Sequence, residues 1–308
     1  MWDGAVELTA ALERALAGFA EAVTGASPGW LVLGVFLHLA NQVARGRGWC
    51  TLLRAASRES VRRRDAIAAW VAGAGAGGLA SARAGDAVRI LLLRRKTTAC
   101  CPELAGTIVA EGAGELLVGA ALLAVAIGVG LGPEFGAPGL IWLVPAVIGT
   151  ALIALVVVRS PRLRAIAGGV GRGCAPLKCP GAYARGVLPW QVASRACRLG
   201  ALACFLAAFD LPATFAAVLL VTAAQSGGRL LPFAPASVGA GAAMLAAAFE
   251  PVTGAAVPAA ELAAFFVGTS VVLTVVGTVL TVSISLQAVR WRGLVAVLRR
   301  PAPALPTP

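Results

Sequence analysis

The sequence of 308 residues has few of the side chains on which most enzymes depend. It holds one histidine, and only two of its 26 basic residues are lysines, Lys96 and Lys178. No serine stands in a nucleophile elbow, no glycine-rich loop is followed by Lys-Ser or Lys-Thr, and a single histidine offers no metal-ligand pair. We therefore expect a protein that is not an enzyme and that has no cofactor and no metal site.

The cysteines do not indicate disulfide bonds. They number seven, which is odd, and most of them fall in predicted cytoplasmic loops or spans, which favours reduced thiols. Cys100 and Cys101 with Cys174 and Cys179 would supply four thiolates for zinc, but they lack the paired C-x2-C spacing of such sites. We expect free thiols.

Charged residues are scarce as well, at 13% of the chain, against about 25% in an average soluble domain. Hydrophobic residues make up 59%, and the mean hydropathy is +0.85. A soluble domain of this size cannot bury so much apolar surface, and several apolar runs approach or exceed the roughly 17–25 residues that cross a bilayer. The sequence predicts an all-α, polytopic transmembrane helix bundle.

The net charge of +12 comes from basic residues that cluster between the apolar runs. Such clusters follow the positive-inside rule and favour a membrane over a nucleic-acid partner. We expect a multi-pass protein of the cell membrane with a cytoplasmic C-terminus. The abundance of arginine and alanine indicates a bacterial source.

Hydropathy and charge predict about seven spans and at least one re-entrant segment. The expected domains are an interfacial amphipathic segment at 1–27, a transmembrane domain at 28–290 and a cytoplasmic tail at 291–308. Trp30, Trp49, Trp142, Trp190 and Trp291 lie near predicted span ends. The apolar runs are residues 30–44, 66–80, 104–131, 140–158, 188–209, 211–230, 242–250 and 257–286.

Two apolar runs are interrupted by residues that disfavour helix. The first contains "GAGAGG" and lies between basic stretches at 45–64 and 83–96, so we interpret it as re-entrant. The second contains "LPFAPASVGAG". Paired interruptions in two halves of a chain are typical of transport sites built from half-helices. The expected breaks are Gly75, Gly77, Gly85, Pro232, Pro235 and Gly239.

Ionisable residues beside these runs are candidates for a polar site, because they are costly within a bilayer. Asp86 and Arg89 are spaced to pair on a helix, with Arg83 directed at a ligand. Glu111 and Glu115 are four apart and share a helical face. Structural alternatives are solvation at a helix start for the acids and plain loop positions for the arginines.

Three more arginines complete the candidate site. Arg195 and Arg198 are three apart near the start of a span, where they either hold a phosphate jointly or extend to the interface. Arg229 lies beside the second interrupted run. A further polar stripe, made of His38, Gln42 and Arg45 in the first span, is interpreted mainly as packing.

The order of three segments resembles the lysylphosphatidylglycerol synthase transmembrane region, also called the flippase-like integral membrane family. They are "ARAGDAVRILLLRRK", "TIVAEGAGELLVGAALL" and "LLPFAPASVGAGAAMLAAAF", and the similarity extends over roughly residues 30–290. Ser81 and Gly112 replace a proline and an arginine of the family pattern. The matching positions are Arg83, Gly85, Asp86, Arg89, Glu111, Glu115, Pro232, Pro235 and Gly239.

The resemblance implies a membrane domain that handles lipids. We expect a lipid flippase or lipid-binding transporter that moves an anionic or aminoacylated phospholipid, or a lipid-linked intermediate, through an arginine-lined cavity. The chain ends at Pro308 without room for an aminoacyl-transfer domain, so we expect no lysyl-lipid synthesis by the chain itself. The alternatives are a non-transporting partner of a lipid-modifying or glycosyltransferase enzyme, and a small-molecule exporter.

Overall fold

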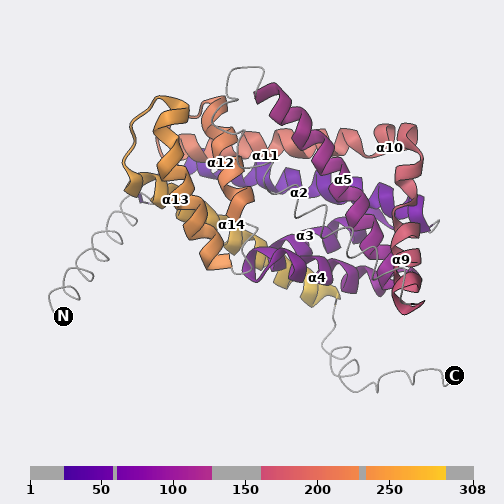
Figure 1. The fold of residues 1–308 in the computed structure, drawn as a ribbon. Coiled ribbons are helices and arrows are strands. Elements are labelled where there is room, and N and C mark those ends of the chain that lie inside the picture. The colour runs from indigo at the N-terminus through magenta and orange to yellow at the C-terminus, as the bar shows by residue number, and fades with distance from the viewer. Residues whose placement is uncertain (1–23, 58–60, 127–160, 229–233, 289–308) are drawn as a thin grey trace, which may run out of the picture.

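The computed structural model describes residues 24–57, 61–126, 161–228 and 234–288 (Figure 1). Within these ranges the chain forms ten α-helices and one short 3-10 helix, in agreement with the all-α prediction. In chain order they are α2 (Pro28–Ser57), α3 (Arg63–Leu79), α4 (Ala82–Arg94), α5 (Cys101–Ala126), α9 (Pro161–Gly173), η2 (Ala175–Lys178), α10 (Pro180–Gly186), α11 (Leu188–Ala208), α12 (Phe215–Gly228), α13 (Ala234–Thr253) and α14 (Ala259–Ala288). All seven cysteines are free thiols, as predicted.

Helices α2 and α11 form a long antiparallel pair that sets the axis of the molecule (Figure 1). At one end the Ser27 amide donates to the Ala208 carbonyl at 2.8 Å. At the other end Gly186, just before α11, faces Thr51 near the end of α2. These contacts give the pair two distinct ends, one near Ser57 and Leu188 and the other near Pro28 and Ala208.

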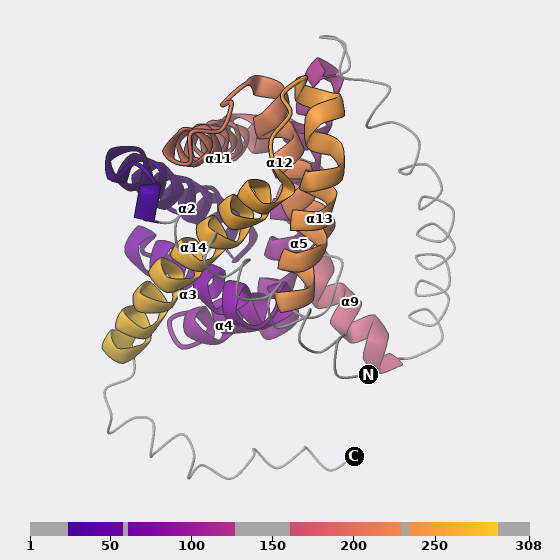
Figure 2. The ribbon, with the colours of Figure 1, turned by 90° about the vertical axis from the view of Figure 1, so that its left-hand side faces the viewer.

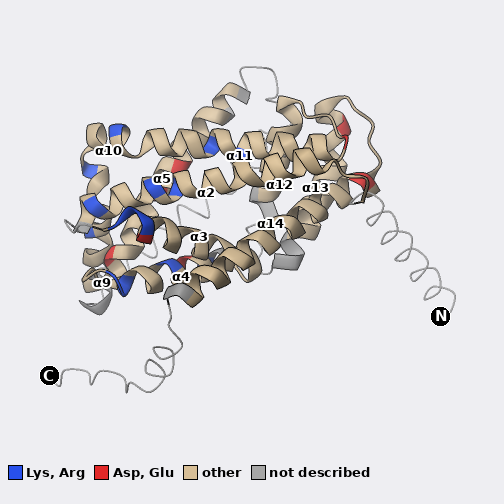
Figure 3. Ribbon diagram, turned by 180° about the vertical axis from the view of Figure 1, so that it is seen from behind, with Lys and Arg blue, Asp and Glu red and all other residues tan. Residues whose placement is uncertain are grey.

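The two ends differ in charge (Figure 3). The end where α2 finishes and α11 begins also holds the start of α3, the end of α4 and the helices α9 and α10, and most of the described Lys and Arg residues lie toward it. We call it the basic end. The opposite end carries Asp210, Glu250 and Glu261 at the turns around α12, α13 and α14, and we call it the acidic end.

Two helical hairpins start from opposite ends of this axis. Helices α3 and α4 pack closely against each other and begin and finish at the basic end. Helices α12 and α13 form a second close pair, which follows α11 and therefore starts at the acidic end. Helix α14 runs from the acidic end and crosses α3 (Figure 2).

The glycine run does not break its helix, so this part of the prediction is wrong. Residues 73–78 lie within α3, because the glycines allow two other helices to approach it. Gly73 and Gly77 face Gly85 of α4, and Gly75 lies directly on the Gly277 carbonyl of α14. The hydroxyl of Thr281 donates to the Ala72 carbonyl at 3.0 Å in the same seam.

The second interrupted run is also helical where the structure describes it. Pro235 and Gly239 lie in the first turns of α13, and proline is tolerated there because the N–H groups of a first turn have no intrahelical acceptor. The expected break at Pro232 lies outside the described residues, as does Arg229.

The predicted end of the first span is wrong too. Helix α2 continues unbroken to Ser57, so Arg45, Arg47 and Arg54 belong to a helix and not to a basic loop. Arg47 stacks on the Trp190 ring at 5.0 Å, which holds the second half of α2 against α11. Trp49, expected at a span end, is fully buried.

Two described helices are long and apolar enough to cross a membrane, over Cys101–Leu122 of α5 and Ala259–Leu286 of α14. Shorter apolar helices cover Phe215–Gln225 and Val238–Thr253. The predicted count of seven spans is therefore not confirmed. The predicted run at 140–158, the tail at 291–308 and most of the N-terminal segment at 1–27 lie outside the described residues.

Among the described residues, the buried apolar side chains form two clusters. One joins α11 to α14 around Phe205, Phe249 and Phe265, and the other joins α2 to α5 around Trp49 and Leu104. The second cluster borders the site described below.

The seam between α3 and α14 gives a direct test of the glycine packing. A Cβ on Gly75 would overlap the Gly277 carbonyl, whereas a Cβ on Gly78 would meet nothing within 4 Å. We expect Gly75→Ala to cost about 1–3 kcal/mol of stability through overpacking. Gly78→Ala is the matched control and should be neutral or stabilising by up to about 1 kcal/mol. Thermal unfolding in detergent measures both, and equal midpoints for the two variants would contradict the seam.

Candidate functional site

Five ionisable side chains from three helices gather beside the α2–α5 core. They are Arg45 of α2, Asp86 and Arg89 of α4, and Glu111 and Glu115 of α5, which we call the charge cluster. The Arg45 Nη2 atom lies 2.9 Å from Glu111 Oε1 and 2.6 Å from Glu115 Oε1. The Arg89 guanidinium pairs with the Asp86 carboxylate.

The local spacing of these residues explains part of the arrangement. Glu111 and Glu115 are one helical turn apart on α5, so both face Arg45, as their spacing predicts. Helix α4 begins at Ala82 with Ser81 as its cap, so Asp86 and Arg89 pair along it, also as predicted.

Burial distinguishes the two glutamates. The Glu111 side chain is only 4% exposed, while that of Glu115 is 33% exposed. Gln191 of α11 donates to Glu111 Oε1 at 3.4 Å, which adds a fourth helix to the site. Tyr183 donates to the Ala110 carbonyl at 2.8 Å and anchors α10 beside the same turn of α5.

Two tryptophans form the wall of the charge cluster. The Trp70 ring of α3 lies 4.7 Å from the Arg45 guanidinium carbon and 4.0 Å from that of Arg89. Trp49 meets Trp70 edge to face at 5.9 Å between ring centres. These cation–π contacts, which contribute about 0.5–2 kcal/mol each, connect the two arginines through one aromatic ring.

Hydrogen bonds fix the orientation of both indoles. Trp49 Nε1 donates to Thr107 Oγ1 at 3.0 Å, and Trp70 Nε1 donates to Gln42 Oε1 at 3.1 Å. The Gln42 amide nitrogen lies 3.2 Å from His38 Nε2. The polar stripe of the first span therefore supports the charge cluster through Trp70.

The members of the charge cluster do not balance one another's formal charge, and they do not satisfy all of their own hydrogen-bond donors. Two arginines face three carboxylates, which leaves one excess negative formal charge. Within the described residues, Arg45 Nε and the Nε and Nη1 atoms of Arg89 are buried without a hydrogen-bond partner. A buried donor without an acceptor costs about 1–3 kcal/mol, so the site holds three donors able to receive an acceptor from a ligand or water.

The structure places the other described candidate arginines on α4 and α11. Arg83 is exposed at the start of α4, and Arg195 is half-buried on α11. Arg198 donates to Gln225 of α12 at 3.1 Å. Of the described candidate arginines, only Arg89 lies in the charge cluster.

The sequence indicated no site role for Arg45, Trp49, Trp70 or Gln191. Arg45 shares a helical face with His38 and Gln42, and this polar stripe is interpreted from the sequence mainly as packing. Trp70 and Gln191 carry no local signal, because their roles depend on contacts between distant segments.

An all-helical fold, two helices long and apolar enough to cross a membrane, and ion pairs beside one of them are the features expected of an integral membrane protein with a polar site. The profile of the family described as "Lysylphosphatidylglycerol synthase TM region" matches residues 8–281. The chain belongs to this family, as its motifs suggested, and the family description relates it to lipid metabolism. Comparison with curated proteins and with solved structures gave no match.

The Arg45–Glu111 pair can be tested by a double-mutant cycle. Arg45→Leu leaves Glu111 buried without its cation, so we expect a loss of about 3–5 kcal/mol. The double variant Arg45→Leu/Glu111→Leu should recover a large part of this loss, because no unpaired charge remains. Thermal unfolding in detergent measures the coupling, and strictly additive effects would refute a coupled pair. Glu115→Gln, at the more exposed partner, should cost less than Arg45→Leu.

Proposed function

We propose that this protein is a lipid flippase or lipid-binding transporter and that the charge cluster receives the lipid headgroup. The observation that carries the proposal is the convergence of five ionisable side chains on the apolar helix α5, with Glu111, Arg45 and Arg89 largely buried. Each such group costs about 2.5–3.5 kcal/mol on insertion scales, and intramembrane charges commonly mark a substrate path.

The donor and acceptor inventory matches a headgroup that carries both signs of charge. Arg45 and Arg89 offer unused N–H donors that suit phosphate oxygens. The excess carboxylate suits an ammonium group, and Trp49 and Trp70 add aromatic faces beside it. Among the lipids expected for this family, an aminoacylated phospholipid supplies both groups, and we propose it ahead of a purely anionic lipid.

Binding would replace internal ion pairs with pairs to the headgroup. The lipid phosphate takes the place of a carboxylate at Arg45, and the ammonium takes the place of an arginine at Glu111 or Glu115. Such an exchange keeps every charge paired while the headgroup passes through hydrocarbon, where an unpaired charge is costly. The acyl chains remain in the surrounding lipid.

The charge asymmetry supports one orientation. By the positive-inside rule the basic end faces the cytoplasm of the cell membrane. Helix α14 runs away from the acidic end, so the C-terminus would be cytoplasmic as well. The hairpins α3–α4 and α12–α13 then start from opposite leaflets, as repeats of inverted topology do in many transporters, although the helices of these hairpins are not broken where the structure describes them.

A leaflet-exchange assay in liposomes tests the proposal. We expect the full chain to accelerate the exchange of a fluorescent aminoacylated lipid, and Arg89→Ala to reduce the rate about tenfold or more, because it removes two of the unused donors. Arg83→Ala is the matched control on the same helix and should keep the rate, since Arg83 is exposed.

The outcomes separate the candidate functions. No acceleration over empty liposomes with aminoacylated or anionic lipids would remove the transport proposal. Stable co-purification of a lipid-modifying enzyme with an inactive chain would then favour the partner interpretation. Equal loss in Arg89→Ala and Arg83→Ala would locate transport away from the charge cluster.

A further inference from the structure

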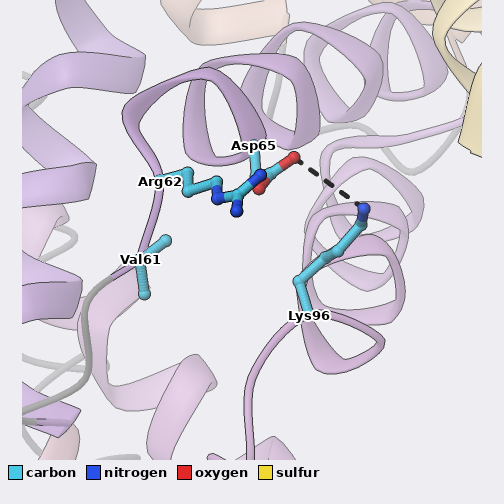
Figure 4. A pocket seen from close by; sticks show the side chains of 4 residues that line it. All are labelled: Val61, Arg62, Asp65 and Lys96. Atoms are coloured by element: carbon cyan, nitrogen blue, oxygen red, sulfur yellow. Dashed lines mark ion pairs between the residues drawn. The ribbon is translucent and has the colours of Figure 1, made fainter.

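A second polar site lies at the basic end, apart from the charge cluster. A cavity of about 270 Å³ opens between the start of α3 and Lys96, the second residue after α4, and it is lined by Val61, Arg62, Asp65 and Lys96 (Figure 4). None of these residues belongs to the charge cluster. A phosphate group fits within this volume, with room for a small part of whatever carries it.

The cavity has an excess of positive charge. Arg62 and Lys96 come from two chain segments and face one carboxylate, Asp65. The Lys96 Nζ atom is 4.0 Å from Asp65 Oδ1, and the Lys96 side chain is 56% exposed, so this is a long and solvated pair. The exposed Arg94 and Arg95 adjoin Lys96 and add to the same positive field.

The wall of the cavity is held in place. The Val61 carbonyl accepts from Arg54 Nε at 3.0 Å and from Arg54 Nη2 at 2.7 Å. This bidentate contact fixes the backbone just before Arg62, where α3 begins. Asp65 belongs to the first turn of the same helix, so the position of this carboxylate depends on where α3 begins.

We infer that the cavity is a binding site for a phosphate group, distinct from the transport path. Its cations converge from two segments, its backbone is anchored, and its charge complements a phosphate and repels a cation. The two sources of such a group are the headgroup of an anionic phospholipid and a soluble phosphate. This inference stands independently of the transport function proposed above.

The test uses the full chain in detergent, with phosphatidylglycerol binding followed by native mass spectrometry and inorganic phosphate binding by calorimetry. We expect Arg62→Gln/Lys96→Gln to weaken binding about tenfold or more, since two charge-assisted hydrogen bonds are lost. Arg94→Gln/Arg95→Gln removes the same charge from the adjoining surface and should change binding by less than about threefold.

A third variant should change phosphate binding in the opposite direction. Asp65→Asn removes the carboxylate that competes with the ligand for Lys96, so phosphate binding should become tighter. A folding defect would weaken binding and therefore cannot produce this result. Binding of phosphatidylglycerol alone identifies the lipid source, and its displacement by inorganic phosphate identifies the soluble source. The inference would be overturned if neither ligand bound, if the two double variants lost binding equally, or if Asp65→Asn bound more weakly than the unaltered chain.

Discussion

The arrangement of the site depends on the Arg45 guanidinium and its two glutamates. A single nitrogen of Arg45 contacts both Glu111 and Glu115, and this joins α2 to α5 inside an apolar bundle. A charge removed from water is tolerated only when it is paired and hydrogen-bonded, so each member requires the others. The Trp70 ring then connects this pair to Arg89 and Asp86 on the neighbouring hairpin. Three separate segments are thereby held at one place by charge and not by shape alone.

Glycine packing is the second condition for this arrangement. Helix α3 presents Trp70 to the arginines only because it can lie close to both α4 and α14. Gly73 and Gly77 provide one close face, and Gly75 provides the other. Glycine lowers the intrinsic stability of a helix by about 1 kcal/mol per residue, but lipid-embedded helices regain stability through contacts between small residues. The seam therefore explains why a segment with weak helix propensity remains helical.

The parts of the site that could be predicted are those set by local spacing. Asp86 with Arg89, and Glu111 with Glu115, are three and four residues apart, and the periodicity of a helix decides that they share a face. The Arg45–Glu111 contact joins residues 66 positions apart, and no local rule contains it. The break expected in the glycine run is absent for a related reason. The packing of α3 against α4 and α14 outweighs the low helix propensity of its glycines. The class of fold could be predicted from hydropathy, whereas the number of spans depends on charged helices such as α2 that hydropathy alone does not resolve.

The two polar sites are related by the helix that they share. Asp65 lines the cavity at the basic end and Trp70 borders the charge cluster, and both belong to α3. Five residues along a helix correspond to a rise of about 7.5 Å. The two places differ in the sign of their excess formal charge, because Arg62 and Lys96 face one carboxylate at the cavity, whereas three carboxylates face Arg45 and Arg89 in the charge cluster. A group that carries a single sign of charge is therefore attracted to one place and repelled by the other, so the binding proposed at the cavity is distinct from the binding proposed at the charge cluster.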